Sequence, residues 1–120
     1  MTADGFDGAR AELGAREAAA RERAARLATQ LEELADAAAG ANADDEHDPE
    51  GATLAFEREQ VAALLRQAET ELAELAAARV RLERGTYGIC TVCHRHIPPE
   101  RLEARPTART CVGCATHDVG

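Results

Sequence analysis

The stretch that decides the fold is residues 87–114, which read YGICTVCHRHIPPERLEARPTARTCVGC. It contains two Cys-x-x-Cys pairs, Cys90 with Cys93 and Cys111 with Cys114, separated by seventeen residues. Each pair predicts a tight turn that directs two sulfurs toward one point, and two such turns supply the four thiolates of a closed tetrahedral zinc site. The sequence therefore predicts one structural Zn2+ ion held by all four cysteines, with no open position for hydrolytic chemistry.

A metal ion is also expected on energetic grounds, because large apolar side chains are scarce near the cysteines. Tyr87, Ile89, Ile97 and Leu102 are almost the whole supply. Structural zinc contributes about 10–16 kcal/mol in small peptides, which is enough to organise such a segment. A thiol redox pair and an iron–sulfur cluster remain alternatives that metal analysis would distinguish. The nearby His94 and His96 are not expected to be ligands, since four sulfurs already satisfy the metal.

Upstream of the cysteines, two long segments repeat every seven residues. The first runs from about Ala9 to Ala39 and the second from about Pro49 to Arg84. Heptads of this kind predict helices packed along a seam. The predicted seam residues are Leu13, Glu17, Ala20, Ala24, Leu27, Leu31, Leu34 and Ala38, then Leu54, Val61, Leu65, Ala68, Leu72, Leu75, Arg79 and Leu82. Glu17 interrupts the first seam near its end, where fraying costs little.

Between the two segments lies a short acidic loop, and Asp48 followed by Pro49 is a good helix start. Two helices of similar length joined by a short loop predict an antiparallel hairpin. We therefore expect a mainly α protein: a flexible N-terminus over 1–8, a coiled-coil hairpin over 9–84 with an acidic tip at 41–50, and a C4 zinc finger over 85–120 with a short C-terminal helical turn.

Charge and composition indicate which kind of partner this protein binds. Aromatic residues make up 2% of the chain, and the net charge is -8. Residues 1–84 hold ten arginines against nineteen acids, whereas four arginines face three acids from Gly85 onward. Acidic helices repel phosphate backbones, so a protein partner is expected rather than nonspecific duplex binding.

The N-terminal stretch MTADGFDGAR has no apolar run and predicts neither a signal peptide nor a membrane anchor. We therefore expect a cytoplasmic protein with reduced thiols, which favours metal over disulfides at the cysteine pairs.

Taken together, the C-terminal motif resembles the zinc finger of the DksA/TraR family. The family pattern is Tyr-Gly-x-Cys-x-x-Cys, then Ile, then Arg-Leu-x-Ala-x-Pro-x-Ala and a second Cys-x-x-Cys. It is met here by Tyr87, Gly88, Cys90, Cys93, Ile97, Arg101, Leu102, Ala104, Pro106, Ala108, Cys111 and Cys114. His94 departs from the pattern, which usually has glycine after the second cysteine.

The resemblance implies a transcription regulator that binds bacterial RNA polymerase, inserting the hairpin tip into the secondary channel to modulate initiation. It implies no enzyme activity and no sequence-specific DNA binding, and a monomer is expected. The candidate tip residues are Asp45, Asp48, Glu50 and Thr53, and Arg105 is a candidate contact to phosphate or to a partner. At the tip, Gly51 and Thr53 stand where the best-known members have Asp and Ala.

Two other functions remain open from the residues alone. One is a zinc ribbon that binds nucleic acid, supported by the cysteine spacing and by Arg101, Arg105 and Arg109. Net acidity and the lack of aromatic stacking groups argue against it. The other is a structural or oligomerisation protein that uses the heptads as a dimer seam. An enzyme is disfavoured because no nucleophile–base set can be assembled.

Overall fold

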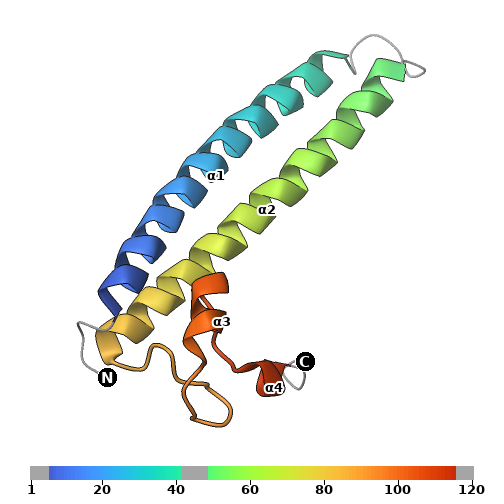
Figure 1. Ribbon diagram of the computed structural model, residues 1–120. Helices are drawn as coiled ribbons and strands as arrows, with labels where there is room; N and C mark the ends of the chain where they lie inside the picture. Colours follow the sequence, from blue (N-terminus) through green and yellow to red (C-terminus); the bar gives the residue numbers. More distant parts are fainter. Residues whose placement is uncertain (1–5, 42–48, 116–120) are drawn as a thin grey trace. The chain divides into compact units, whose positions relative to one another are not determined.

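The computed structural model describes residues 6–41 and 49–115 of the 120-residue chain. Two long helices dominate it, α1 (Asp7–Ala41) and α2 (Pro49–Arg84). Two short helices follow, α3 (Pro99–Ala104) and α4 (Val112–Ala115) (Figure 1). Apart from the helices, the described part has one isolated antiparallel bridge, between Ile89 and His96. The prediction of a mainly α chain with a long antiparallel helical hairpin is confirmed.

The chain divides into two compact units. The first, here called the zinc unit, comprises residues 1–18 and 73–120, and the second, the hairpin unit, comprises residues 19–72. The zinc unit therefore contains the first turns of α1, the last turns of α2 and all of the cysteine-bearing segment. Unlike the predicted division at residue 85, this one joins the ends of both long helices to the cysteines.

The predicted seam is buried along nearly its whole length. All eight predicted positions of α1 are buried or half-buried, and so are all those of α2 except Arg79. At that point the fully buried residue is its neighbour Ala78. At this point the next buried residue of α2 comes after three positions, at Ala78, and not after the predicted four, at Arg79. The methyl group of Ala78 therefore faces the seam, and Arg79 lies at its edge. Alanine at such positions lets two helix backbones approach closely.

Arg79 is at the edge of the seam because it pairs with the other polar seam residue. Its Nη1 donates to Glu17 Oε1 at 2.6 Å, and the Glu17 residue is only 6% exposed. Glu17 is thus a buried carboxylate with an ion-pair partner. It is not an interruption of the heptad pattern that is tolerated because the helix end frays. In the hairpin unit, Arg23 Nη1 contacts Glu71 Oε2 at 3.1 Å. From the first pair to the second, the α1 number rises from 17 to 23 while the α2 number falls from 79 to 71, as antiparallel helices require.

Helix α2 ends at Gly85, as predicted. Gly85 has φ +77°, and its N–H donates to the Leu82 carbonyl. The next N–H, of Thr86, reaches back to the Arg81 carbonyl at 2.9 Å. This pair of bonds is the Schellman ending, in which a residue in the left-handed region reverses the chain at a helix C-terminus. It turns the chain from α2 directly into the cysteine segment.

The N-terminal boundary differs from the prediction. α1 begins at Asp7 rather than Ala9, and Phe6 packs edge-on against Tyr87 with ring centroids 5.0 Å apart. Phe6 is thus joined to the cysteine-bearing segment by an aromatic contact, while the flexibility of residues 1–8 stays a prediction. Residues 1–5, and Asp45 and Asp48 of the predicted tip, lie outside the described residues.

Within the described ranges, no helix is both long enough and apolar enough to cross a bilayer.

Candidate metal centre

The first cysteine pair is held by a turn that closes on itself. The Cys90 N–H donates to the Arg95 carbonyl at 2.8 Å, and the His94 N–H donates to the Cys90 carbonyl at 2.9 Å. His94 has φ +62°, the left-handed conformation that reverses the chain after Cys93. The bridge between Ile89 and His96 closes the base of this turn. These bonds bring the side chains of Cys90 and Cys93 to the same side.

The second cysteine pair lies at the start of α4, and the segment before it is fixed by its backbone carbonyls. Tyr87 Oη donates to the Pro106 carbonyl at 2.7 Å, Arg81 Nη2 to the Thr107 carbonyl at 3.2 Å, and Arg101 Nε to the Thr110 carbonyl at 2.8 Å. Three side chains from different parts of the zinc unit thus hold the short segment 106–110. Its position decides where Cys111 lies.

These donors sit in a partly desolvated environment. Burial raises the pKa of Tyr87, and burial, together with the nearby charge of Arg109, lowers the pKa of Arg81. A neutral hydroxyl at Tyr87 is the form that donates to a carbonyl.

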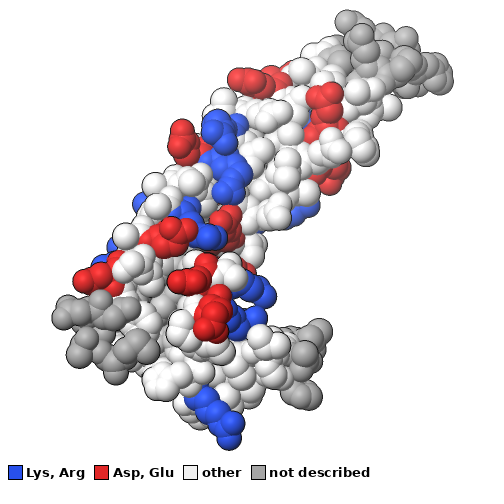
Figure 2. Space-filling view, viewed as in Figure 1, with Lys and Arg blue, Asp and Glu red and all other residues white. Residues whose placement is uncertain are grey.

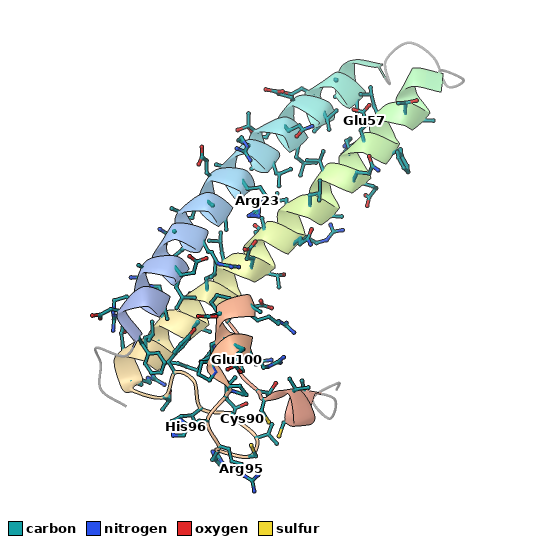
Figure 3. The ribbon with its side chains drawn as sticks, in the orientation of Figure 1. Arg23, Glu57, Cys90, Arg95, His96 and Glu100 are labelled. Carbon is teal, nitrogen blue, oxygen red and sulfur yellow. The ribbon has the colours of Figure 1, made fainter. Side chains whose placement is uncertain are left out.

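One further bond joins the two cysteine turns to each other. The Thr91 N–H donates to the Arg109 carbonyl at 2.9 Å, so the first turn lies against the strand-like segment that leads into the second. As a result, the Cys93 and Cys111 Sγ atoms are 3.8 Å apart (Figure 3 shows the labelled Cys90 and its neighbours).

All four sulfurs, of Cys90, Cys93, Cys111 and Cys114, lie within 4.8 Å of one another. A tetrahedron with zinc–sulfur bonds of about 2.3 Å has edges of about 3.8 Å, so the four cysteines fit a zinc ion. In the described part of the chain they are also the only cluster of potential metal ligands, and His94 and His96 are exposed outside it. The cysteines form a C4 zinc site, as predicted.

The electrostatics of the thiols also favour a cation. The pKa of Cys90 is lowered to about 6, first because the backbone N–H of Cys93 donates to its sulfur. The pKa of Cys111 is lowered in the same way by the Cys114 N–H. In contrast, the hydrogen bond with the Cys111 side chain, together with burial, raises the pKa of Cys114 to about 12. Four thiolates this close repel one another, so the thiols cannot all ionise without a cation. A dication offsets this repulsion by coordinating every thiolate.

The other predicted site residues are not members of the four-cysteine cluster. Thr53 is an exposed residue of α2, and Glu50 belongs to the first turn of that helix, although its side chain is outside the described set. Arg105 is exposed at the end of α3. The hairpin residue Thr53 and the zinc-unit residue Arg105 belong to different units.

Sequence reasoning missed the role of the arginines as carbonyl donors. The sequence offered Arg101 as a possible nucleic-acid contact, whereas its Nε donates to the Thr110 carbonyl. The bond of Arg81 to Thr107 was not foreseen at all. The only signal in the sequence is that Arg101 and Tyr87 belong to the recurring motif around the cysteines, which does not reveal the carbonyl each one reaches.

Comparison with known proteins agrees with this site. Residues 85–117 match the family model described as the prokaryotic DksA/TraR C4-type zinc finger. The chain is 41% identical over 75 residues to the uncharacterized protein YteA of Bacillus subtilis, covering 62% of this chain and 31% of YteA. It is 34% identical over 71 residues to the RNA polymerase-binding transcription factor DksA of Haemophilus influenzae, covering 57% of this chain and 49% of that protein. The chain thus spans about a third to a half of these relatives.

The fold has a counterpart among solved structures. Transcription factor DksA2 of Pseudomonas aeruginosa superposes with a TM-score of 0.55 at 22% identity, covering 89% of this chain and 82% of DksA2. At that identity the likeness concerns the fold alone. A long helical hairpin followed by a four-cysteine site defines a coiled-coil zinc-finger protein.

The four-cysteine finger at residues 85–117 is thus similar to the C4-type zinc fingers of the DksA/TraR family.

Proposed function

We propose that this protein is a transcription factor that acts in the cytoplasm by binding bacterial RNA polymerase. The observation that carries the proposal is the DksA/TraR zinc finger at residues 85–117, joined to an antiparallel hairpin in a chain 34% identical to a polymerase-binding factor. The acidic surface supports a protein partner over DNA, because exposed acids repel phosphate. An intramolecular seam that is already paired supports a monomer.

The proposed mode of action is insertion of the hairpin tip into the secondary channel of the polymerase. α1 has 35 residues and α2 has 36, so each helix extends about 50 Å at 1.5 Å per residue. Asp45, Asp48, Glu50 and Thr53 are the proposed tip contacts, and Arg105 is the proposed contact of the zinc unit with phosphate or with polymerase. Carboxylates at the tip would act on basic groups or on a magnesium ion near the active centre.

Binding to core polymerase tests the proposal directly. The zinc-loaded protein should form a complex at micromolar concentration that survives gel filtration. The Cys114→Ser variant, which lacks one thiolate, should bind more weakly because its zinc unit is no longer fixed. Failure of the zinc-loaded wild type to bind polymerase would defeat the proposal. A salt-dependent gel shift with DNA or RNA in the same buffer would instead favour a nucleic-acid-binding zinc ribbon.

A second experiment separates the tip from the docking surfaces. Asp45→Asn/Asp48→Asn/Glu50→Gln should reduce the effect on initiation in a purified transcription assay much more than it reduces polymerase affinity. The matched control is Asp36→Asn/Glu57→Gln/Glu59→Gln, which removes three exposed acids of the long helices (Glu57 is labelled in Figure 3). It should leave both quantities near wild type. Equal loss of affinity and effect in the tip variant would make the tip a docking element.

A further inference from the structure

Two valines are exposed at the cysteine turns of the zinc unit. Val92 is 53% exposed and Val112 is 62% exposed, and each occupies a position between the cysteines of a Cys-x-x-Cys pair. The thiolates and the backbone bonds of the turns do not require an apolar residue at either position, because neither side chain is buried. A single exposed valine is ordinary, and exposed valines in both turns of one metal site offer apolar area for contact with a partner.

The metal site brings together the two turns that carry these valines. Val92 directly precedes Cys93 and Val112 directly follows Cys111, and the Sγ atoms of these cysteines are 3.8 Å apart. The bond from the Thr91 N–H to the Arg109 carbonyl holds the same two turns together. Each valine is therefore a sequence neighbour of one member of this sulfur pair.

The two sequence stretches that carry the valines are basic, although Glu100 and Glu103 lie between them in α3. Residues 90–99 and 104–115 contain Arg95, Arg105 and Arg109 but no Asp or Glu. Arg95 is exposed, and Figure 3 shows it pointing away from its loop into solvent. On the face seen in Figure 2, the end of the zinc unit that carries the cysteine turns shows basic atoms and no acidic ones.

We propose that Val92, Val112 and Arg95, here called the knuckle patch, form a docking surface for an acidic protein surface with an apolar depression. The inference rests on the proposed function for the identity of the partner, RNA polymerase. The valines supply apolar area and the arginine supplies charge complementary to acids on the partner. Nucleic acid is the less favoured partner, because stacking needs aromatic side chains and, in the zinc unit, Phe6 is half-buried and Tyr87 is buried.

The test compares matched valine variants in binding to core polymerase. Val92→Thr/Val112→Thr keeps the branched shape but replaces two methyl groups by hydroxyls. Val80→Thr makes the same change at a 40% exposed valine of α2 in the same unit. We expect the double variant to bind about tenfold more weakly, and the control to bind as wild type, since apolar contact area is lost only at the patch. Arg95→Glu should lower affinity too, whereas Arg10→Glu, at an exposed residue of α1, should not.

Zinc content and tyrosine emission confirm that each variant is folded before binding is measured. Wild-type affinity in the double variant would overturn the inference and leave the proposed function intact. Absence of binding by the wild type would overturn both. If the double variant loses binding to DNA or RNA instead, the patch contacts nucleic acid and the inference of a protein partner is wrong.

Discussion

His94 shows how one residue can limit the stability of the metal site. Its φ of +62° lies in the region that residues with a Cβ atom enter at a cost of about 1–2 kcal/mol, although histidine enters it more often than most. Its N–H closes the turn on the Cys90 carbonyl. The backbone bond is therefore required and the side chain is not, which explains why the family pattern has glycine at this position.

His94→Gly should raise the free energy of unfolding of the zinc-loaded protein by about 0.5–1 kcal/mol, because glycine removes the Cβ penalty and keeps the N–H. The control His94→Ala also removes the imidazole but keeps a Cβ, so it should not stabilise. Thermal or urea unfolding followed by tyrosine emission measures both variants. Equal stability changes in the two would show that the imidazole, and not the backbone, sets the effect.

Replacement of glycine by alanine should have opposite effects on the stability of the protein at two positions. Gly88 has φ +79°, and an added Cβ would lie 3.2 Å from Phe6 Cζ and 3.3 Å from Leu102 Cδ1. Gly14 lies within α1 with nothing within 4 Å of an added Cβ. Gly88→Ala should destabilise the protein by about 1–2 kcal/mol. Gly14→Ala should stabilise it by about 0.5–1 kcal/mol, because alanine is the better helix former.

Urea unfolding of both alanine variants gives the comparison directly. Stabilisation by Gly88→Ala would mean that the turn between α2 and the first cysteine pair does not have the conformation described.

At the scale of the helices, the ion pair between Glu17 and Arg79 sets the register of the hairpin in the zinc unit. A carboxylate that is 6% exposed needs a partner, and only one register brings Arg79 within 2.6 Å of it. The alanine-rich seam is less selective, since methyl groups fit one another in several registers. The buried charge thus adds specificity that the apolar positions provide weakly.

A double-mutant cycle tests this pair. Glu17→Arg and Arg79→Glu should each destabilise the protein, and the double swap should recover part of the loss, with a coupling of about 1 kcal/mol because Arg79 is half exposed. The exposed pair Glu12–Arg16, 2.7 Å apart within α1, is the control and should couple by about 0.3–0.5 kcal/mol. Urea unfolding of the cycle gives these values. Zero coupling at Glu17–Arg79 would remove its role in the register.

At the scale of the whole molecule, zinc and the seam stabilise different parts of the chain. The zinc unit depends on four thiolates and a small core around Tyr87 and Ile97, which are each 3% exposed. The hairpin unit depends on helix packing at Ala20, Val61 and Ala68. Tyr87 is the only tyrosine and no tryptophan is present, so intrinsic emission reports on the zinc unit alone.

Removal of zinc by a chelator should therefore change tyrosine emission fully while most of the helical circular dichroism remains, because most helical residues belong to α1 and α2. Re-addition of zinc should restore the emission. Cys114→Ser serves as the control and should show the altered emission from the start. Simultaneous collapse of both signals on chelation would mean that the hairpin cannot form without the metal.

The sequence by itself determined the two long helices, their seam and the four cysteines, because heptad spacing and Cys-x-x-Cys pairs are local patterns with direct structural meaning. α2 begins and ends at the predicted residues, Pro49 and Arg84. Only the tertiary structure decided how the polar residues are used. Glu17 meets Arg79, and Arg101 reaches the Thr110 carbonyl, across sequence separations that no local pattern encodes.

The same holds for the exposed valines beside the sulfurs. Val92 and Val112 stand twenty positions apart in the sequence, and each lies within one cysteine pair. The two turns that carry them meet because four thiolates converge on one point, and the detailed position of each side chain is a property of the folded chain.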